Sequence, residues 1–112
     1  MILRALAFAL PILPGMAWAD PPDLVQAVFR CHGGVTVPVV FVNPEAGKAY
    51  AVALLEGDLI GMRAAISASG ARYRSDDGRQ AWQVWVKGDR AMISQGPDGQ
   101  DRARFGDCLL QQ

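Results

Sequence analysis

Residues 71–94 read ARYRSDDGRQAWQVWVKGDRAMIS, which is three short segments with apolar residues separated by turn-forming groups. The segments are residues 71–74, 81–87 and 90–94. Ser-Asp-Asp-Gly follows the first segment, and Gly-Asp separates the second from the third. Short apolar segments joined by Gly- and Asp-containing turns are typical of strands that pair with their chain neighbours. This stretch therefore predicts antiparallel β-structure.

The same pattern continues on both sides of this stretch. Gly, Asn, Asp and Pro lie between the remaining apolar runs, and no repeat or interdomain linker is visible. Ala- and Leu-rich residues 49–66 would also suit a helix, but Gly57 and Gly61 lie inside them. Gly61 predicts a bulge or a close backbone approach. The other candidate strands are residues 25–31, 35–42, 49–56, 59–68 and 103–110. Eight such segments predict an all-β domain, either an antiparallel barrel or a sandwich.

The first 19 residues have the features of a secretory signal peptide. Arg4 precedes a short apolar run, and the segment ends in Ala17-Trp18-Ala19, which has small residues at the first and third positions before Asp20. Two prolines interrupt the run, which is shorter than the ~20 apolar residues of a membrane-spanning helix. We therefore expect cleavage after Ala19 rather than an uncleaved anchor. Removing 19 of 112 residues leaves one domain of 93 residues, 20–112.

The charge of this domain excludes some partners. Loss of Arg4 leaves ten basic and eleven acidic side chains, spread along the chain. A nucleic-acid partner requires a basic patch or stripe, and a membrane surface attracts polybasic runs. Acidic residues at 76–77 and 98–107 would help to attract a basic protein, but ordinary solvated turns are the favoured explanation for them. We therefore expect neither nucleic acid nor an anionic membrane surface as the partner.

Few residues suit catalysis or metal binding. The only histidine, His32, follows Cys31, and its Gly-Gly neighbours favour a turn. Small exported domains often carry disulfides, so we expect Cys31 to pair with Cys108. A zinc site requires four ligands, and no nucleophile and base pair is evident. We therefore expect no enzyme activity, metal or cofactor.

Side chains alternate between the two faces of a strand, which allows residues to be assigned to the core or to the surface. In residues 81–87, Trp82, Val84 and Val86 share the face that suits the core, opposite Ala81, Gln83, Trp85 and Lys87. If residues 59–69 are extended, the core face carries Met62, Ala64, Ile66 and Ala68, and the surface face carries Arg63, Ala65, Ser67 and Ser69. By themselves, the Ser-rich segment is an ordinary turn and Lys87 a solvated charge at a strand end.

The order and spacing of these segments along the chain resemble those of the family of bacterial inhibitors of c-type lysozyme. This family is known in membrane-bound and periplasmic forms. The resemblance covers most of the predicted domain. It rests on Phe29-Arg30-Cys31, the strand at 35–42, Ser-Ala-Ser-Gly-Ala-Arg-Tyr at 67–73, Trp-Val-Lys-Gly at 85–88, and Cys108.

The resemblance implies a small eight-stranded antiparallel barrel tied by a disulfide, with c-type lysozyme as its protein partner. In this family a Ser-containing loop and a Lys-containing strand end enter the substrate cleft of the enzyme. Residue by residue, these become Lys87 and Ser69, with Ser67 as the alternative. Gly70 and Gly88 would allow the backbone to approach the cleft. Arg72, Tyr73 and Trp85 would line or brace the contact, and Trp85 would suit a barrel-packing role equally well.

The predicted cleavage site bears on localisation. Membrane-bound members of the family are lipoproteins whose mature chain begins with Cys, whereas here the first cysteine is Cys31. No lipid attachment site is apparent, so the resemblance implies the soluble periplasmic form of a Gram-negative bacterium. The alternative function is a non-catalytic periplasmic or envelope-associated barrel that binds a small ligand or another partner.

Overall fold

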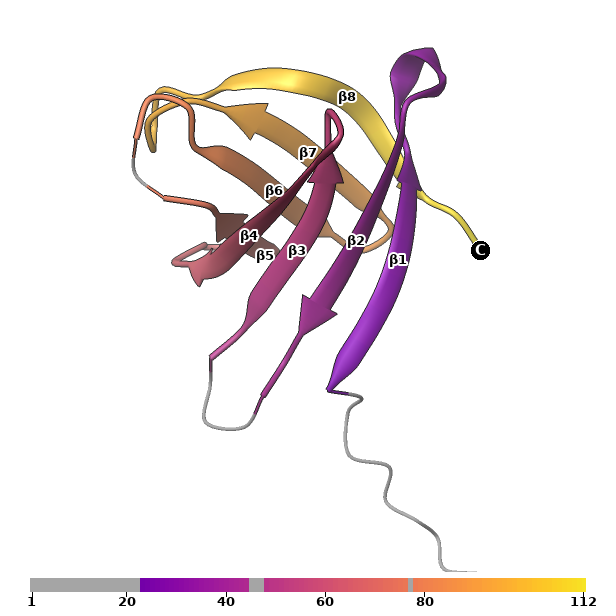
Figure 1. Cartoon of the computed structure of the whole chain (residues 1–112), viewed down its shortest axis with the longest axis horizontal. Coiled ribbons are helices and arrows are strands. Elements are labelled where there is room, and N and C mark those ends of the chain that lie inside the picture. The colour runs from indigo at the N-terminus through magenta and orange to yellow at the C-terminus, as the bar shows by residue number, and fades with distance from the viewer. Residues whose placement is uncertain (1–22, 45–47, 77) are drawn as a thin grey trace, which may run out of the picture.

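The structure, a computed structural model, describes residues 23–44, 48–76 and 78–112. The predicted signal peptide, residues 1–19, and its cleavage position lie outside the described residues. Within the described residues, eight strands and one short 3-10 turn occur in chain order (Figure 1). They are β1 (Leu24–Arg30), the turn His32–Gly34, β2 (Thr36–Val42), β3 (Tyr50–Leu55), β4 (Asp58–Ala65), β5 (Ala71–Arg74), β6 (Trp82–Lys87), β7 (Arg90–Gln95) and β8 (Arg102–Leu110).

Each strand pairs antiparallel with the next, and β8 pairs with β1, so the sheet closes into a barrel. The predicted all-β class and the barrel implied by the resemblance are confirmed. No helix in the described part of the chain is long and apolar enough to cross a membrane.

Two tight hairpins set the register of neighbouring strands. Glu56 and Gly57 between β3 and β4 both have positive φ, at 52° and 85°. This pattern belongs to a type I′ turn, whose twist matches that of the paired strands. Between β6 and β7, Gly88 alone has positive φ, 62°, as in a type II′ turn, and Lys87 pairs with Arg90. The second hairpin therefore holds Lys87 at the very end of its strand.

The core is formed by the inward face of every strand. Its largest fully buried side chains are Phe29, Leu55, Ile93, Val37, Val39 and Val84. On β6 the inward residues are Trp82 and Val84, with Val86 packed against the core, as the alternation predicted. A barrel of eight strands has an interior just wide enough for side chains to fill it, and these residues do so.

One part of the β4 prediction is wrong. The strand ends at Ala65 rather than at residue 68, and Ile66 is 93% exposed instead of sharing the core face with Met62. Ala64 and Ala68 are exposed as well. Alternation holds only while the backbone is extended, and the chain leaves the sheet after Ala65. Gly61 marks neither a bulge nor a close approach, because it pairs regularly with Val52 and has open space beside it.

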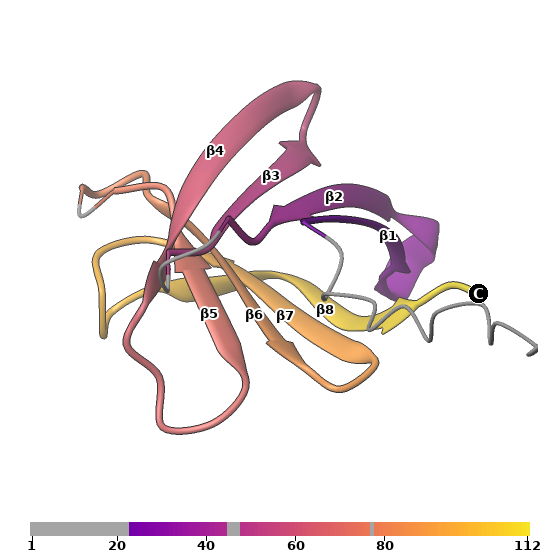
Figure 2. The same cartoon turned by 90° about the horizontal axis from the view of Figure 1, so that it is seen from below.

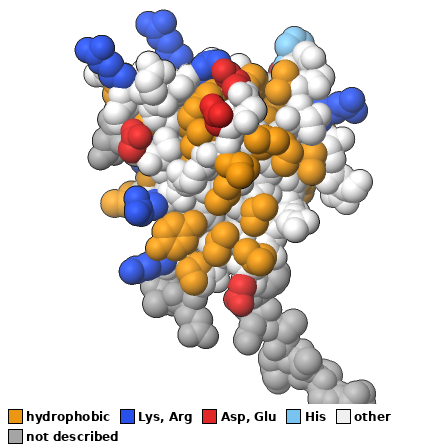
Figure 3. All heavy atoms as spheres, viewed as in Figure 1, with side chains coloured by type: hydrophobic (Ala, Val, Ile, Leu, Met, Phe, Trp, Pro, Cys, Tyr) orange, Lys and Arg blue, Asp and Glu red, His pale blue; other side chains and the backbone are white. Residues whose placement is uncertain are grey.

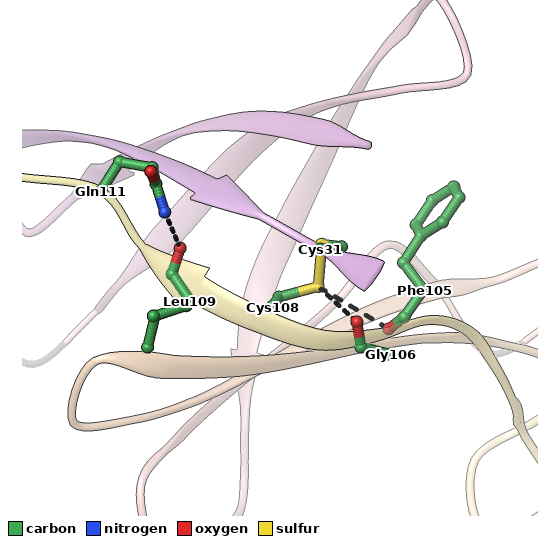
Figure 4. The surroundings of a disulfide bond; sticks show 6 residues. All are labelled: Cys31, Phe105, Gly106, Cys108, Leu109 and Gln111. Atoms are coloured by element: carbon green, nitrogen blue, oxygen red, sulfur yellow. Dashed lines mark hydrogen bonds between the residues drawn. A yellow bond between two sulfur atoms is a disulfide. The ribbon is translucent and has the colours of Figure 1, made fainter. Parts of the chain in front are cut away.

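The ends of the barrel meet at the disulfide. Cys31 and Cys108 are bonded, which confirms the predicted pair (Figure 4). Beside it, β1 and β8 share the two residue pairs Phe29–Leu110 and Arg30–Leu109. The disulfide therefore reinforces a short seam between the first and last strands.

Exposed apolar side chains gather on the outer face of the first half of the barrel. They include Leu24, Val28, Leu54 and Leu59, on β1, β3 and β4 (Figure 3). The segments singled out from the sequence for function lie elsewhere, on β5, β6 and the loop before β5.

Candidate functional site

The Ser loop, which we define as residues 66–70, lies beside the end of β6. It leads from β4 into β5, and β5 pairs with β6 so that Ala71 faces Val86 and Arg72 faces Trp85. The Ser loop and the β6–β7 hairpin therefore project from the same side of the barrel (Figure 2). Two segments that are separated in the sequence form one surface because β5 joins them.

Gly70 is the point of contact between the Ser loop and β6. Its φ is 68°, and a Cβ built on it would lie 2.4 Å from the carbonyl oxygen of Val86 and 2.8 Å from Cγ of Lys87. Both the positive φ and the close approach require glycine. Gly70 therefore allows the loop to pack directly on the strand end.

Trp85 connects the two segments. Its indole Nε1 donates a hydrogen bond of 2.8 Å to the carbonyl oxygen of Ser69, and Nζ of Lys87 lies 4.4 Å from the centroid of its ring. The second contact is a cation–π interaction, which restrains an otherwise flexible side chain. Trp85 is half-buried and points outward, so it braces the surface and does not pack in the barrel core.

The two serines of the loop have different roles. The hydroxyl of Ser67 donates to the carbonyl oxygen of Ser69 within the loop. This is the ordinary turn interaction expected of a Ser-rich segment. The side chain of Ser69 is exposed, and no hydrogen bond engages its hydroxyl within the described residues. Of the two hydroxyls, that of Ser69 is the one available to a partner.

Lys87 presents a positive charge that has no acidic partner among the described residues. It is exposed, and none of the ion pairs among the described residues involves it. An ammonium group offers three hydrogen-bond donors. A Cβ atom built on the next residue, Gly88, would have no neighbouring heavy atom within 4 Å. The end of the hairpin is therefore an open surface, where Lys87 and its exposed cross-strand partner Arg90 both carry positive charge.

Arg72 and Tyr73 are adjacent in the sequence but lie on opposite faces of β5. Tyr73 does not line this surface, because it is 6% exposed and packs inside the barrel, with its ring centroid 5.4 Å from that of Phe41, and its alternative role of bracing the contact stays a prediction. Burial raises the pKa of Tyr73 above its ordinary value. Arg72 points outward, and its guanidinium binds the carbonyl oxygen of Ile66 through Nε (3.1 Å) and Nη2 (2.7 Å).

A polar cluster behind the Ser loop was not predicted from the sequence. Gln83 accepts from Arg72 (2.9 Å) and from Arg74 (3.0 Å), and it donates to Asp101 (3.1 Å). Asp98, in the turn between β7 and β8, forms an ion pair of 2.8 Å with Arg72. Alternation did place Gln83 on the outer face, but nothing in the sequence indicated that the β7–β8 turn covers it.

The electrostatics of this cluster follow from the ion pair. The hydrogen bond from Arg72 holds the pKa of Asp98 below its ordinary value, and the charges of Arg72 and Arg74 act in the same direction. A hollow of about 250 Å³ lies between the Ser loop and the β7–β8 turn, and its walls include Ser67, Trp85 and Asp98.

Within the described ranges, no group of three or more His, Cys, Asp or Glu residues is placed to hold a metal ion. The site as a whole consists of a hydroxyl, an ammonium group and an aromatic ring on a rigid, projecting surface. Such a surface can donate hydrogen bonds and positive charge to a partner.

Comparison with known proteins identifies the family of this chain. Residues 29–102 match the family model described as membrane-bound lysozyme-inhibitor of c-type lysozyme. This range includes the Ser loop and the end of β6. A membrane-bound lysozyme inhibitor of c-type lysozyme from Cupriavidus necator is 34% identical over 80 residues, which are 71% of this chain and 60% of the relative. The chain thus matches about 60% of the length of that relative.

Two solved structures have the same fold. The periplasmic lysozyme inhibitor of c-type lysozyme from Salmonella typhimurium superposes with a TM-score of 0.70 and 29% identity, over 80% of this chain and 100% of that one. The Pseudomonas aeruginosa inhibitor MliC, solved in complex with hen egg white lysozyme, superposes with a TM-score of 0.61 and 20% identity, over 99% and 100%. The family match, which spans more than half of the residues, shows that this chain belongs to the family of lysozyme inhibitors represented by membrane-bound MliC.

Proposed function

We propose that this protein inhibits c-type lysozyme by filling the enzyme's substrate cleft with Ser69 and Lys87. The observation that carries the proposal is the position of both groups on one braced surface within the matched residues, where neither side chain forms a hydrogen bond or ion pair with another described residue. A member of the same fold, MliC from Pseudomonas aeruginosa, was solved with hen egg white lysozyme. The family match makes a lysozyme of this type the first partner to test.

The chemistry of the cleft suits these two groups. The active site of lysozyme has two carboxyl groups, one that is a general acid and one that stays ionised. The ammonium of Lys87 would pair with the ionised carboxylate. The hydroxyl of Ser69 would hydrogen-bond to either protonation state. Inhibition would therefore consist of occlusion and charge pairing without covalent chemistry, and the protein itself would not be an enzyme.

The central test substitutes Lys87 and Ser69. We expect Lys87→Ala to weaken binding to lysozyme by about 2 to 5 kcal/mol, since it leaves a desolvated carboxylate without its partner. Ser69→Ala should add a further loss. The measurement is the inhibition constant from the clearing of cell-wall suspensions by hen lysozyme. Lys48→Ala is the matched control, because Lys48 is the only other lysine, is exposed and lies outside the site.

The outcomes separate three functions. If the Lys87→Ala, Ser69→Ala double variant inhibits as strongly as the parent, the assigned site is wrong. If the parent protein has no effect on lysozyme even in excess, the alternative of a non-catalytic envelope barrel with another ligand is favoured. Clearing of cell walls by the protein alone would instead indicate an enzyme that acts on peptidoglycan.

We also propose that the chain is exported to the periplasm as a soluble protein after cleavage between Ala19 and Asp20. The basis is the signal-peptide pattern and the absence of a Cys at the predicted start of the mature chain. The intact mass of the protein recovered from a periplasmic fraction tests this directly. A mass that begins at Asp20 is expected, whereas retention of residues 1–19 or a mass increment from attached lipid would contradict the proposal.

A further inference from the structure

We propose that Arg72 is a positioning residue that holds the Ser loop in its binding shape, and that Asp98 takes part in lysozyme binding through Arg72. This inference rests on the proposed function in one respect, namely that the Ser loop is the element presented to the enzyme. It assigns to the β7–β8 turn a role that neither the sequence pattern nor the family resemblance indicated.

Arg72 has few hydrogen-bond donors left for a partner protein. A guanidinium has five N–H donors. Nε and Nη2 each donate to the carbonyl oxygen of Ile66, and Nη1 donates to both Gln83 and Asp98. Four of the five donors are therefore used within the chain, and the side chain is only 15% exposed. A side chain whose donors are used within its own chain supports a surface and does not bind a second protein directly.

Arg72 holds the Ser loop at its first residue, Ile66. Ile66 is the first residue after β4, and its side chain is 93% exposed, so it contributes no burial to hold the loop. The two hydrogen bonds from Arg72 fix its carbonyl group instead. At the other end of the loop, Trp85 fixes the carbonyl group of Ser69. The hydroxyl of Ser69 thus lies on a segment tied at both ends by side chains of β5 and β6.

Arg72 is itself held in place by side chains of β6 and of the β7–β8 turn. Asp98 supplies the charge partner, and Gln83 supplies a neutral acceptor that it shares with Arg74. Arg74 in turn donates to the carbonyl oxygen of Gly96 at 2.6 Å. Two arginines on one face of β5 therefore reach across β6 to the same turn. A planar, bidentate guanidinium can hold such a geometry, and a lysine ammonium cannot.

The experiment measures the Ser loop in the free protein and then in inhibition. The test variants are Arg72→Lys and Asp98→Ala. Arg72→Lys keeps the positive charge but loses the planar guanidinium and its several N–H donors. Their controls are Arg63→Lys and Asp58→Ala, which change exposed residues that make none of the described side-chain hydrogen bonds or ion pairs. Backbone ¹⁵N order parameters report the mobility of each residue.

We expect both test variants to lower the order parameters of residues 67–70 from about 0.8 to below about 0.6, with the strands unchanged. Inhibition should weaken about tenfold for Arg72→Lys, as lost charge-assisted hydrogen bonds imply. The control variants should change neither quantity. In double-mutant cycles, Asp98→Ala should couple to Ser69→Ala, because a loop without its contacting hydroxyl gains little from being held. Coupling to Lys87→Ala should be much smaller.

An unchanged loop in both test variants would overturn the inference, even if inhibition falls, because Arg72 would then act by direct contact. A mobile loop with undiminished inhibition would overturn it as well. The loop measurement needs no lysozyme, so a parent protein that fails to inhibit refutes the proposed function and leaves the order parameters to decide whether Arg72 holds the loop.

Discussion

Individual residues of the site differ in whether their polar groups already have partners within the chain. Within the described structure Lys87 has no ion pair and the hydroxyl of Ser69 has no hydrogen bond, whereas Ser67 and Arg72 donate hydrogen bonds to their own chain. Residue type alone did not distinguish these roles, because all four are polar and lie near the same turn. The distinction comes from counting which donors and acceptors already have partners.

Gly70 provides a sharp test at the residue scale. We expect Gly70→Ala to weaken inhibition strongly, because the new methyl group would clash with the carbonyl oxygen of Val86 and displace the loop. Gly57→Ala is the matched control, since Gly57 has a similar positive φ of 85° and open space around it. Both variants should lose about 1 to 2 kcal/mol of stability to backbone strain. Equal inhibition constants for the two variants would show that the contact of Gly70 with β6 does not shape the site.

At the scale of elements, β5 depends on the turn that follows β7. It is only four residues long, and both of its arginines donate to the β7–β8 turn. The sequence predicted β5 and the turn correctly as separate pieces. It did not predict their contact, because Arg72 and Asp98 are 26 positions apart.

The link between β5 and this turn has an expected pH dependence. The pKa of Asp98 is lowered in the folded state, chiefly by its hydrogen bond from Arg72. Its stabilising contribution is therefore complete above the ordinary value of 3.8 and is lost as the pH falls through the lowered native pKa. We expect NMR titration to show Asp98 ionising below the ordinary aspartate range.

Substitution of Arg72 supplies the control for this titration. In Arg72→Gln the pKa of Asp98 should rise toward its ordinary value, because the cation and its charge-assisted hydrogen bond are removed. Urea unfolding of Asp98→Asn should then lack the corresponding loss of stability below about pH 4. An Asp98 that titrates identically with and without Arg72 would mean that the ion pair does not persist in solution.

On the scale of the whole molecule, stability depends on how the barrel closes. β1 and β8 share two residue pairs, and the disulfide lies next to them (Figure 4). The bonded cysteines are 77 positions apart, so the disulfide restricts almost the whole domain in the unfolded state. A cross-link over a loop of this length has a large effect on chain entropy.

Removing the disulfide should therefore destabilise the barrel more than it alters the site. We expect the Cys31→Ser, Cys108→Ser variant to lose about 2 to 5 kcal/mol of unfolding free energy in urea. The reduced parent protein is the control and should unfold at the same urea concentration as the variant. Under conditions where the variant remains folded, it should still inhibit lysozyme, because the Ser loop lies between β4 and β5 and Lys87 lies on β6, and neither cysteine belongs to these segments. Coincident unfolding curves for the oxidised and reduced parent would contradict this account.

The amino-acid pattern predicted the eight strands, most of their ends to within one residue, the inward residues of β6 and the cysteine pair. These features depend on the alternation of apolar residues, on turn-forming residues and on cysteine count, which are local or compositional properties. Three features became evident only in the folded barrel: β4 ends before Ile66, Tyr73 faces the core, and Asp98 holds Arg72. These features depend on barrel closure, which brings distant segments together and determines which polar groups are already satisfied and which remain free for a partner.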